Sequence, residues 1–352
     1  MSIAAIDLFC GIGGLSKGLS LAGIELRAGF DNDNSCKFAY EKNNAEFVCA
    51  DTSNLKGSEI IKRFKKDDIK ILAGCAPCQP FSRYSLKYRK NGWQDEKWKL
   101  LYSFARLVDE VNPDIVVMEN VPNLEKQNVY KDFIGTLKTT GFATPYSRIV
   151  YCPDYGVPQK RKRLILIASK FGKIDLIDPL YTPENYRTVR DAIGTLEKIS
   201  AGQSSLRDPL HTARALSEKN IKRIEQSVPG GTWRDWDENL KLKCHRRDTG
   251  HSYPSVYGRM EWDKPSPTIT TQFYGYGNGR FGHPEQNRAI SFREGALLQS
   301  FPREYVFIDE KHPINTRELG IHIGNAVPVE IGRAIGISIM NHLSNQGRIK
   351  ND

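Results

Sequence analysis

Two cysteines, Cys75 and Cys78, lie close together in the segment GCAPCQPFS (residues 74–82). A Cys-x-x-Cys pair can be half of a zinc site, a redox couple or neither. A zinc site needs further paired ligands, but Cys244 and His245 are distant and lack that spacing. Prolines on both sides of Cys78 favour a rigid loop over the helix start typical of a redox couple. The remaining functional interpretation is nucleophilic catalysis by a Cys78 thiolate. The alternative is that Cys78 is a buried, inert cysteine.

Charged residues lie at the ends of two other apolar segments. Glu119 comes near the end of PDIVVMENV (113–121), where an unpaired carboxylate would be costly, so it either forms a salt bridge with an arginine or has a function. The basic run QKRKR (159–163) directly precedes another apolar segment. On a strand, Arg161 and Arg163 would point to the same face and could serve one site, whereas a bare basic run would be a solvated surface.

A glycine-rich turn follows the first apolar segment, in DLFCGIGG (7–14). Gly11, Gly13 and Gly14 would let the backbone approach a ligand closely and tighten a turn from strand to helix. Asp31 ends the next apolar segment, where an acid usually accepts hydrogen bonds from ribose hydroxyls. Because the pattern is not GxGxxG, a dinucleotide is not the expected ligand, and the alternative is a tight turn without any ligand.

The elements that must position these residues alternate between strands and helices. Short apolar segments predict strands, and helical spacing predicts helices. The expected strands are 3–9, 24–30, 69–74, 113–121 and 163–169, and the expected helices are 15–22, 100–111 and 328–343. This order predicts an α/β fold with a doubly wound, mostly parallel sheet. Ligands bind at the carboxyl ends of the strands in such sheets, so Cys78 and Glu119 should face the same crevice.

Composition limits the class of protein. The 352 residues carry a formal net charge of +10, which is compatible with a polyanionic partner such as nucleic acid. Seven scattered cysteines fit a reducing cytoplasm better than a disulfide framework. We expect neither a signal peptide nor a membrane partner, since no apolar run is long enough to span a bilayer. After about residue 180 the strand–helix alternation fades, which predicts a second, less regular domain.

Taken together and in this order, the motifs resemble those of the DNA (cytosine-5)-methyltransferase family, in particular its compact bacterial members of restriction–modification type. The matching segments are DLFCGIGG, APCQPFS, ENV, QKRKR, REGALLQSFP (293–302) and GNAVP (324–328). The resemblance covers about residues 3–180 and 265–335. It implies a Rossmann-like methyltransferase fold with a catalytic domain over 1–185, a target-recognition domain over 186–290, a hinge over 291–320 and a C-terminal segment over 321–352 that returns to the catalytic domain.

The resemblance also implies a reaction. A methyl group from S-adenosyl-L-methionine would be transferred to carbon 5 of a cytosine flipped out of a specific double-stranded DNA sequence. Cys78 would add to carbon 6, and Glu119 would hydrogen-bond ring nitrogen 3 and the exocyclic amine. Arg163 would hold the carbonyl oxygen, assisted by Arg161. The base that removes the carbon 5 proton is not identifiable.

A cofactor site follows from the same resemblance. Phe9 would lie against the adenine, the three glycines of the turn beneath the methionine part, and Asp31 at the ribose hydroxyls. The full set implied is Phe9, Gly11, Gly13, Gly14, Asp31, Asn32, Asp51, Pro77, Leu100 and Asn325. No metal site is expected.

The segment after the nucleophile departs from the family pattern. Residues 83–99 would close over the flipped base, but FSRYSLKY lacks the usual early glycine, and DEKWK (95–99) stands where Asp-x-Arg-Gly is common. The recognition region contains the basic segment KLKCHRR (241–247), from which the target sequence cannot be read. Three alternatives remain: an RNA cytosine-5 methyltransferase, a binding protein without catalysis, and a redox or zinc protein.

The expected partner is double-stranded DNA, bound by a monomeric enzyme of the bacterial cytoplasm that is nucleoid-associated when on DNA. A restriction endonuclease acting on the same site is a further candidate partner, without a stable complex between the two.

Overall fold

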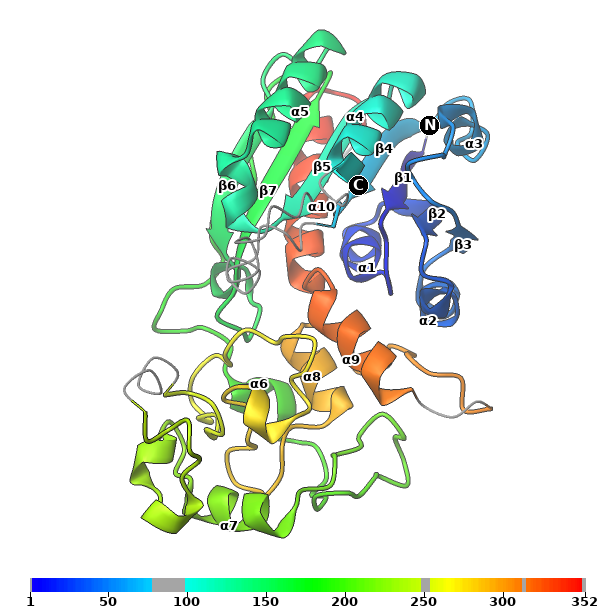
Figure 1. Cartoon of the computed structure of the whole chain (residues 1–352). Coiled ribbons are helices and arrows are strands. Elements are labelled where there is room, and N and C mark those ends of the chain that lie inside the picture. The colour runs from blue at the N-terminus through cyan, green and yellow to red at the C-terminus, as the bar shows by residue number, and fades with distance from the viewer. Residues whose placement is uncertain (1, 78–98, 248–253, 312–314, 350–352) are drawn as a thin grey trace. The chain divides into compact units, whose positions relative to one another are not determined.

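The computed structural model describes residues 2–77, 99–247, 254–311 and 315–349 (Figure 1). It contains two compact units. Unit 1 comprises Met1–Tyr155, Lys162–Leu180 and Val327–Asp352, and unit 2 comprises Gly156–Arg161 and Tyr181–Ala326. These boundaries differ from the expected division. Residues 156–161 join unit 2 because Gln159 and Lys160 pair with Ser266, and the segment expected to be a hinge lies within unit 2.

Unit 1 is built on one seven-stranded sheet. The strands are β1 (Ile3–Leu8), β2 (Glu25–Asp31), β3 (Glu46–Cys49), β4 (Ile69–Gly74), β5 (Ile115–Asn120), β6 (Tyr146–Tyr151) and β7 (Lys162–Ser169). Their order is β3-β2-β1-β4-β5-β7-β6, in which β7 runs antiparallel to both neighbours and the other pairs are parallel (Figure 1). The predicted doubly wound, mostly parallel sheet is therefore confirmed.

Helices cover both faces of this sheet. They are α1 (Gly14–Leu21), α2 (Lys37–Asn43), α3 (Gly57–Ile61), α4 (Lys99–Val111), α5 (Asn128–Thr139) and α10 (Val329–Asn345). Ile6 and Leu8 of β1 belong to one apolar core with residues of α4 and α5. Asp7 points to the opposite face, where its side chain meets Ser16 of α1. Alternation along β1 thus packs α4 and α5 on one face and α1 on the other.

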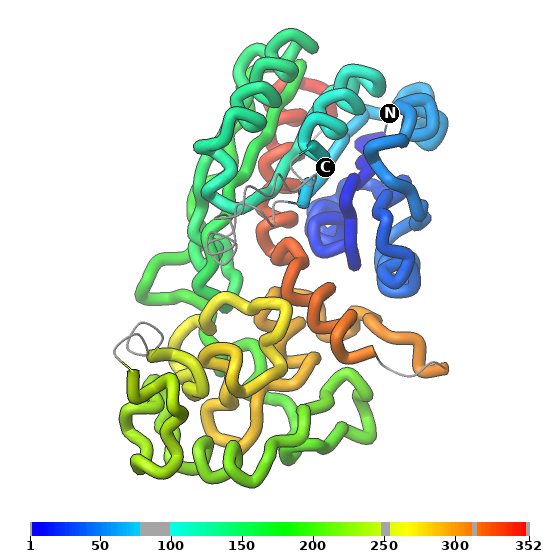
Figure 2. The backbone as a smooth tube through the Cα atoms, in the orientation of Figure 1, coloured from blue at the N-terminus to red at the C-terminus, as the bar shows by residue number. Residues whose placement is uncertain are grey.

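The last helix packs closely against the first, so the N-terminal and C-terminal segments of unit 1 lie together (Figure 2). Glycines make this approach possible. A Cβ atom on Gly18 of α1 would lie 2.5 Å from the Cα atom of Gly332 in α10, and one on Gly336 would lie 2.5 Å from the Cβ of Ala22. Small residues at these positions let the two helix backbones approach each other.

All the predicted strands and helices are present, with ends that shift by no more than two residues. In unit 1 the sequence did not predict β3, β6, α2, α3 or α5, and in unit 2 it predicted none of the helices. Strand β6 was missed because three of its six residues are exposed, since it lies at an edge of the sheet and has no apolar run.

Unit 2 is less regular, as expected for the second half of the chain. Its helices are α6 (Val189–Ile193), α7 (Glu218–Gln226), α8 (Phe292–Leu298) and α9 (Thr316–Asn325). Within the part that the structure describes, its β-pairing is limited to isolated bridges. A buried bidentate ion pair joins Arg288 to Glu294, both nitrogen–oxygen distances being 2.7 Å, and Glu294 also completes the capping box of α8 with Ser291.

None of the helices in the described ranges combines the length and the apolar character needed to cross a bilayer.

The glycine contact between α1 and α10 gives a stability prediction. Gly18→Ala should lower the free energy of unfolding by about 1–3 kcal/mol, because the new methyl group meets backbone atoms of α10. Gly135→Ala in α5 is the matched control, since a Cβ there meets no atom within 4 Å. It should raise the stability by about 0.5–1 kcal/mol through helix propensity. Urea unfolding measures both, and equal shifts of the same sign would contradict the close packing.

Candidate active site

The sheet topology brings several polar side chains to one edge of unit 1. Strands β1, β4 and β5 are parallel neighbours, so their carboxyl ends meet at this edge. Strand β7 is antiparallel to β5 and therefore begins there. Cys75 follows the last residue of β4, Glu119 is the penultimate residue of β5, and Arg163 is the second residue of β7.

Glu119 is 2% exposed and has a different neighbour at each carboxylate oxygen. Arg163 Nε lies 2.5 Å from Oε1, and the Cys75 thiol donates a hydrogen bond to Oε2 at 2.9 Å. The Arg163 N–H is not directed at Oε1, and that oxygen accepts no hydrogen bond from any described residue. Arg163 itself donates to the carbonyl of Lys162 at 2.8 Å. The site therefore holds a buried carboxylate with one unused acceptor, Oε1. The ion pair between Glu119 and Arg163 is the salt bridge that the sequence offered as one of two alternatives.

Asn120 anchors the backbone that leads to the predicted nucleophile. Its side-chain amide donates to the carbonyl of Ala76 at 3.0 Å, and its Oδ1 accepts the N–H of Val121. Cys78 lies outside the described residues, as do residues 83–98 of the predicted closing loop, so the role of Cys78 stays a prediction. The sequence analysis assigned no role to Asn120. The feature that could have identified it is an amide side chain at the end of a buried apolar strand.

A second group of residues surrounds the turn after β1. Phe9 has φ +57°, a conformation that costs free energy for a residue with a side chain, and its ring packs against Phe104 of α4 with centroids 6.4 Å apart. Gly11 and Gly13 also have positive φ, and Gly14 begins α1. A Cβ on Gly11 would meet no atom within 4 Å, so packing does not explain this glycine. The turn leaves open space beside its backbone, as a bound ligand would require.

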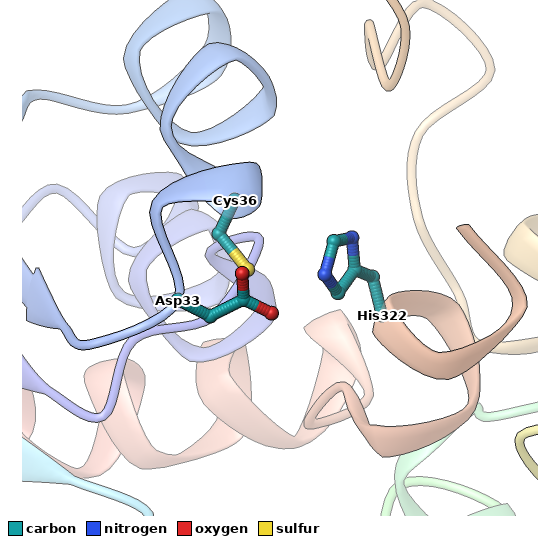
Figure 3. A group of neighbouring side chains, drawn as sticks. All are labelled: Asp33, Cys36 and His322. Atoms are coloured by element: carbon teal, nitrogen blue, oxygen red, sulfur yellow. The ribbon is translucent and has the colours of Figure 1, made fainter. Parts of the chain in front are cut away.

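Asp31 joins this turn to the end of β2. Its Oδ2 accepts the N–H of Gly11 and its Oδ1 accepts the N–H of Asp33, each at 2.9 Å. Burial raises the pKa of Asp31, while these backbone hydrogen bonds oppose the shift. Asp33 in turn caps the short 3-10 helix Asn34–Cys36 by accepting the N–H of Ser35. Figure 3 shows the side chains of Asp33 and Cys36 from this segment. The predicted cofactor residues Gly11 and Asp31 are thus brought together.

The other predicted cofactor residues are spread over several elements. Asn32 and Asp51 are exposed after β2 and β3, Pro77 is half-buried after β4, and Leu100 is half-buried at the start of α4. The N–H of Ala50 donates to the carbonyl of Asp31, which places the segment containing Asp51 beside the end of β2. Asn325 is the exposed last residue of α9 in unit 2. His322, which is labelled in Figure 3, lies on the same helix. Their roles at a cofactor stay predictions.

A buried carboxyl group that the sequence reasoning missed lies beneath the glycine turn. Asp7 is 1% exposed, and its Oδ2 accepts a hydrogen bond from Ser16 Oγ at 2.6 Å. Ser16 Oγ also lies 2.8 Å from the Tyr40 hydroxyl, while Oδ1 of Asp7 has no hydrogen-bond partner among the described residues. Burial, with a smaller contribution from Asp31, raises the pKa of Asp7 to about 7. Its only sequence signal is an acid inside an apolar segment.

The structure corrects one expectation about the basic run. Strand β7 begins at Lys162, so Arg161 and Arg163 do not lie on one strand as predicted. Arg161 belongs to unit 2, where it is 5% exposed and donates hydrogen bonds to the backbone carbonyls of Ile269 and Gly324. This guanidinium satisfies buried carbonyl groups, and only Arg163 is brought to Glu119.

Comparison with known proteins identifies the family. The model of the C-5 cytosine-specific DNA methylases matches residues 3–341, so the chain belongs to this family of S-adenosylmethionine-dependent methyltransferases. It is similar to the Type II methylase M.HgiDII of Herpetosiphon aurantiacus, with 52% identity over 97% of this chain and 96% of the relative. It is also similar to the Type II methyltransferase M1.BsuMI of Bacillus subtilis, with 33% identity over 96% of this chain and 80% of the relative. These relatives do not favour the RNA alternative.

Solved structures agree on the fold. A prophage-encoded protein of Escherichia coli matches with a TM-score of 0.70 at 24% identity, covering 97% of this chain and all of that one. DNMT2 of Spodoptera frugiperda matches with a TM-score of 0.66 at 17% identity, covering 97% and 100%. At these identities the likeness shows the fold alone.

The buried carboxyl of Asp7 gives a prediction about pH. Because its pKa is about 7 in the folded chain against 3.8 for the ordinary group, the folded state holds a proton that the unfolded state releases between these values. The free energy of unfolding should therefore fall by about 1.4 kcal/mol per pH unit as the pH rises from about 4 to about 7, relative to Asp7→Asn. Urea unfolding of both proteins at pH 5, 6, 7 and 8 measures the difference, and a difference that is constant with pH would contradict it.

Proposed function

We propose that this protein transfers a methyl group from S-adenosyl-L-methionine to carbon 5 of a cytosine in a specific double-stranded DNA sequence. One observation carries the proposal beyond family membership. The buried carboxylate of Glu119, with Arg163 at one oxygen and a free acceptor position, lies at the end of the strand next to β4, whose carboxyl end leads to Cys78. A carboxylate and a guanidinium at this edge match the polar edge of a cytosine ring, and the thiol of Cys78 would be the group that attacks carbon 6.

The chemistry explains why a thiolate is needed. Carbon 5 of cytosine is a poor nucleophile, and addition of the Cys78 thiolate to carbon 6 gives it enamine character. The electron pair of the ring then forms the bond from carbon 5 to the methyl group, while the methyl–sulfur bond of S-adenosylmethionine would break and its sulfur would leave as a neutral thioether. A base removes the proton from carbon 5, the double bond re-forms, and the thiolate leaves. A thiolate suits both addition and departure.

Glu119 and Arg163 would orient and polarise the ring. The exocyclic amine of cytosine is a donor, and Oε1 of Glu119 is a buried acceptor without a hydrogen bond from the described residues. A proton passed from this carboxyl group to ring nitrogen 3 would neutralise the negative charge that develops there as the thiolate adds. Arg163 has five N–H donors, and within the described structure it donates one hydrogen bond, to Lys162. Its remaining donors are available to the carbonyl oxygen of the base.

Residues of the turn after β1 would hold the cofactor. Gly11 offers open space beside a backbone with positive φ, Phe9 presents a half-buried ring, and Asp31 has an ordered carboxylate. These features fit a ligand with an adenine, a ribose and an amino-acid part. The same assignment extends to Gly13, Gly14, Asn32, Asp51, Pro77, Leu100 and Asn325. Arg161 would act indirectly, through the backbone carbonyls that it holds in unit 2.

Unit 2 would supply recognition of the DNA sequence, with the segment Lys241–Arg247 as its basic part. Since the similar relatives are Type II methylases, a restriction endonuclease acting on the same sequence is the proposed functional counterpart. We propose that the enzyme acts as a monomer in the bacterial cytoplasm.

A covalent trap tests the substrate and the nucleophile together. DNA containing 5-fluorocytosine has no proton to lose from carbon 5, so the enzyme should stay attached to it when labelled S-adenosylmethionine is present. We expect a denaturation-resistant protein–DNA adduct with the wild type and none with Cys78→Ser. Methylation of small RNAs in place of DNA would overturn the proposed substrate, and an adduct that persists in Cys78→Ser would overturn the nucleophile.

The role of Glu119 has its own test. Glu119→Gln should lower kcat by about 100-fold or more, because the neutral amide cannot exchange a proton with the ring. Specific DNA binding should be retained. Glu125→Gln, at an exposed position on the segment that follows β5, is the matched control and should keep full activity. Steady-state methylation kinetics measure both, and an active Glu119→Gln enzyme would rule out this role.

A further inference from the structure

We propose that Cys75 is a positioning residue, whose thiol fixes the orientation of the Glu119 carboxylate. This inference rests on the proposed function of Glu119. Cys75 is half-buried directly after β4, and its backbone N–H donates to the carbonyl of Leu8 in β1 at 3.3 Å. Its thiol reaches the neighbouring strand and donates to Oε2 of Glu119 at 2.9 Å. The thiol is thus anchored to one strand and directed at the carboxylate of another.

The thiol limits how Glu119 can meet Arg163. Rotation about the last bond of a glutamate side chain is soft, so an unrestrained carboxylate could turn both oxygens towards a guanidinium and form a bidentate pair. With Oε2 held by Cys75, the close approach of Arg163 Nε, at 2.5 Å, is to Oε1, and Oε1 accepts no hydrogen bond from the described residues. The hydrogen bond from Cys75 therefore preserves the acceptor that the base requires.

This arrangement also separates the roles of the two cysteines in the opening motif. A thiolate on Cys75 would lie 2.9 Å from a buried carboxylate oxygen, and the repulsion between two such negative charges is strong. The Cys75 thiol acts instead as the hydrogen-bond donor to this oxygen. The sequence alone assigned Cys75 no separate role, and the hydrogen bond to Glu119 gives it a donor function.

Three variants test the proposal by kinetics. Cys75→Ala removes the donor and should lower kcat by about tenfold or more, the effect of one hydrogen bond to a charged group. The KM values for DNA and for S-adenosylmethionine should change by less than about twofold, since the proposed role of Cys75 is to orient Glu119 and not to bind either molecule. Cys75→Ser keeps a donor and should restore kcat to within about threefold of the wild type. Cys49→Ala, at an exposed cysteine on β3, controls for loss of a thiol and should be fully active.

The double variant Cys75→Ala/Glu119→Gln separates this inference from the proposed function. We expect it to be no slower than Glu119→Gln alone, because Cys75 acts through that carboxylate. A fully active Cys75→Ala beside an inactive Glu119→Gln would overturn the inference and leave the proposed function intact. Equal losses in Cys75→Ala and Cys75→Ser would also overturn it, since a packing role would not be rescued by a hydroxyl. An active Glu119→Gln would overturn both.

Discussion

The placement of one carboxylate inside an apolar sheet constrains the rest of unit 1. Glu119 follows four fully buried residues of β5, and a charge there is stable only beside donors or cations. No residue near it in sequence supplies them, so they come from the neighbouring strands β4 and β7. The reversed direction of β7 is essential, because a parallel strand would begin at the opposite edge and carry Arg163 away from Glu119. The single antiparallel strand inside the sheet therefore has a chemical consequence.

The turn after β1 is also constrained, in its case by unfavourable backbone angles. Three of its residues have positive φ, including Phe9, and such conformations persist only where the surroundings fix them. The carboxylate of Asp31 holds the N–H of Gly11 from one side, and the Asp7–Ser16–Tyr40 chain packs beneath the turn from the other. Two carboxyl groups thus stabilise a loop that has open space beside Gly11. Burial of Asp7 and the nearby charge of Asp31 both raise the pKa of Asp7, to about 7.

Local patterns predicted the parts of the site that depend on local chemistry. Apolar runs gave the strands, glycines gave the turn, and an acid at the end of an apolar run marked Glu119. The sequence could not show that β7 is antiparallel, because a buried apolar run reads the same in either direction. It also could not show the hydrogen bond from Cys75, whose acceptor lies 44 residues away, or the exposed edge strand β6. The prediction that Arg161 shares a strand face with Arg163 was wrong for the same reason, since the carbonyl partners of Arg161 are more than 100 residues away in sequence.

The arginines of unit 2 change how the net charge should be interpreted. A domain with short helices and isolated bridges buries many backbone carbonyls that no sheet can satisfy, and each needs a donor. Buried arginines supply these donors: Arg259 donates to the carbonyls of Ile224, Ser227, His283 and Gln286, and Arg223 donates to that of Leu240. Arg161 acts in the same way, and the charge of Arg288 is neutralised by its buried ion pair with Glu294. These cations hold the fold together, so the charge available to DNA phosphates is smaller than the total of +10 suggests.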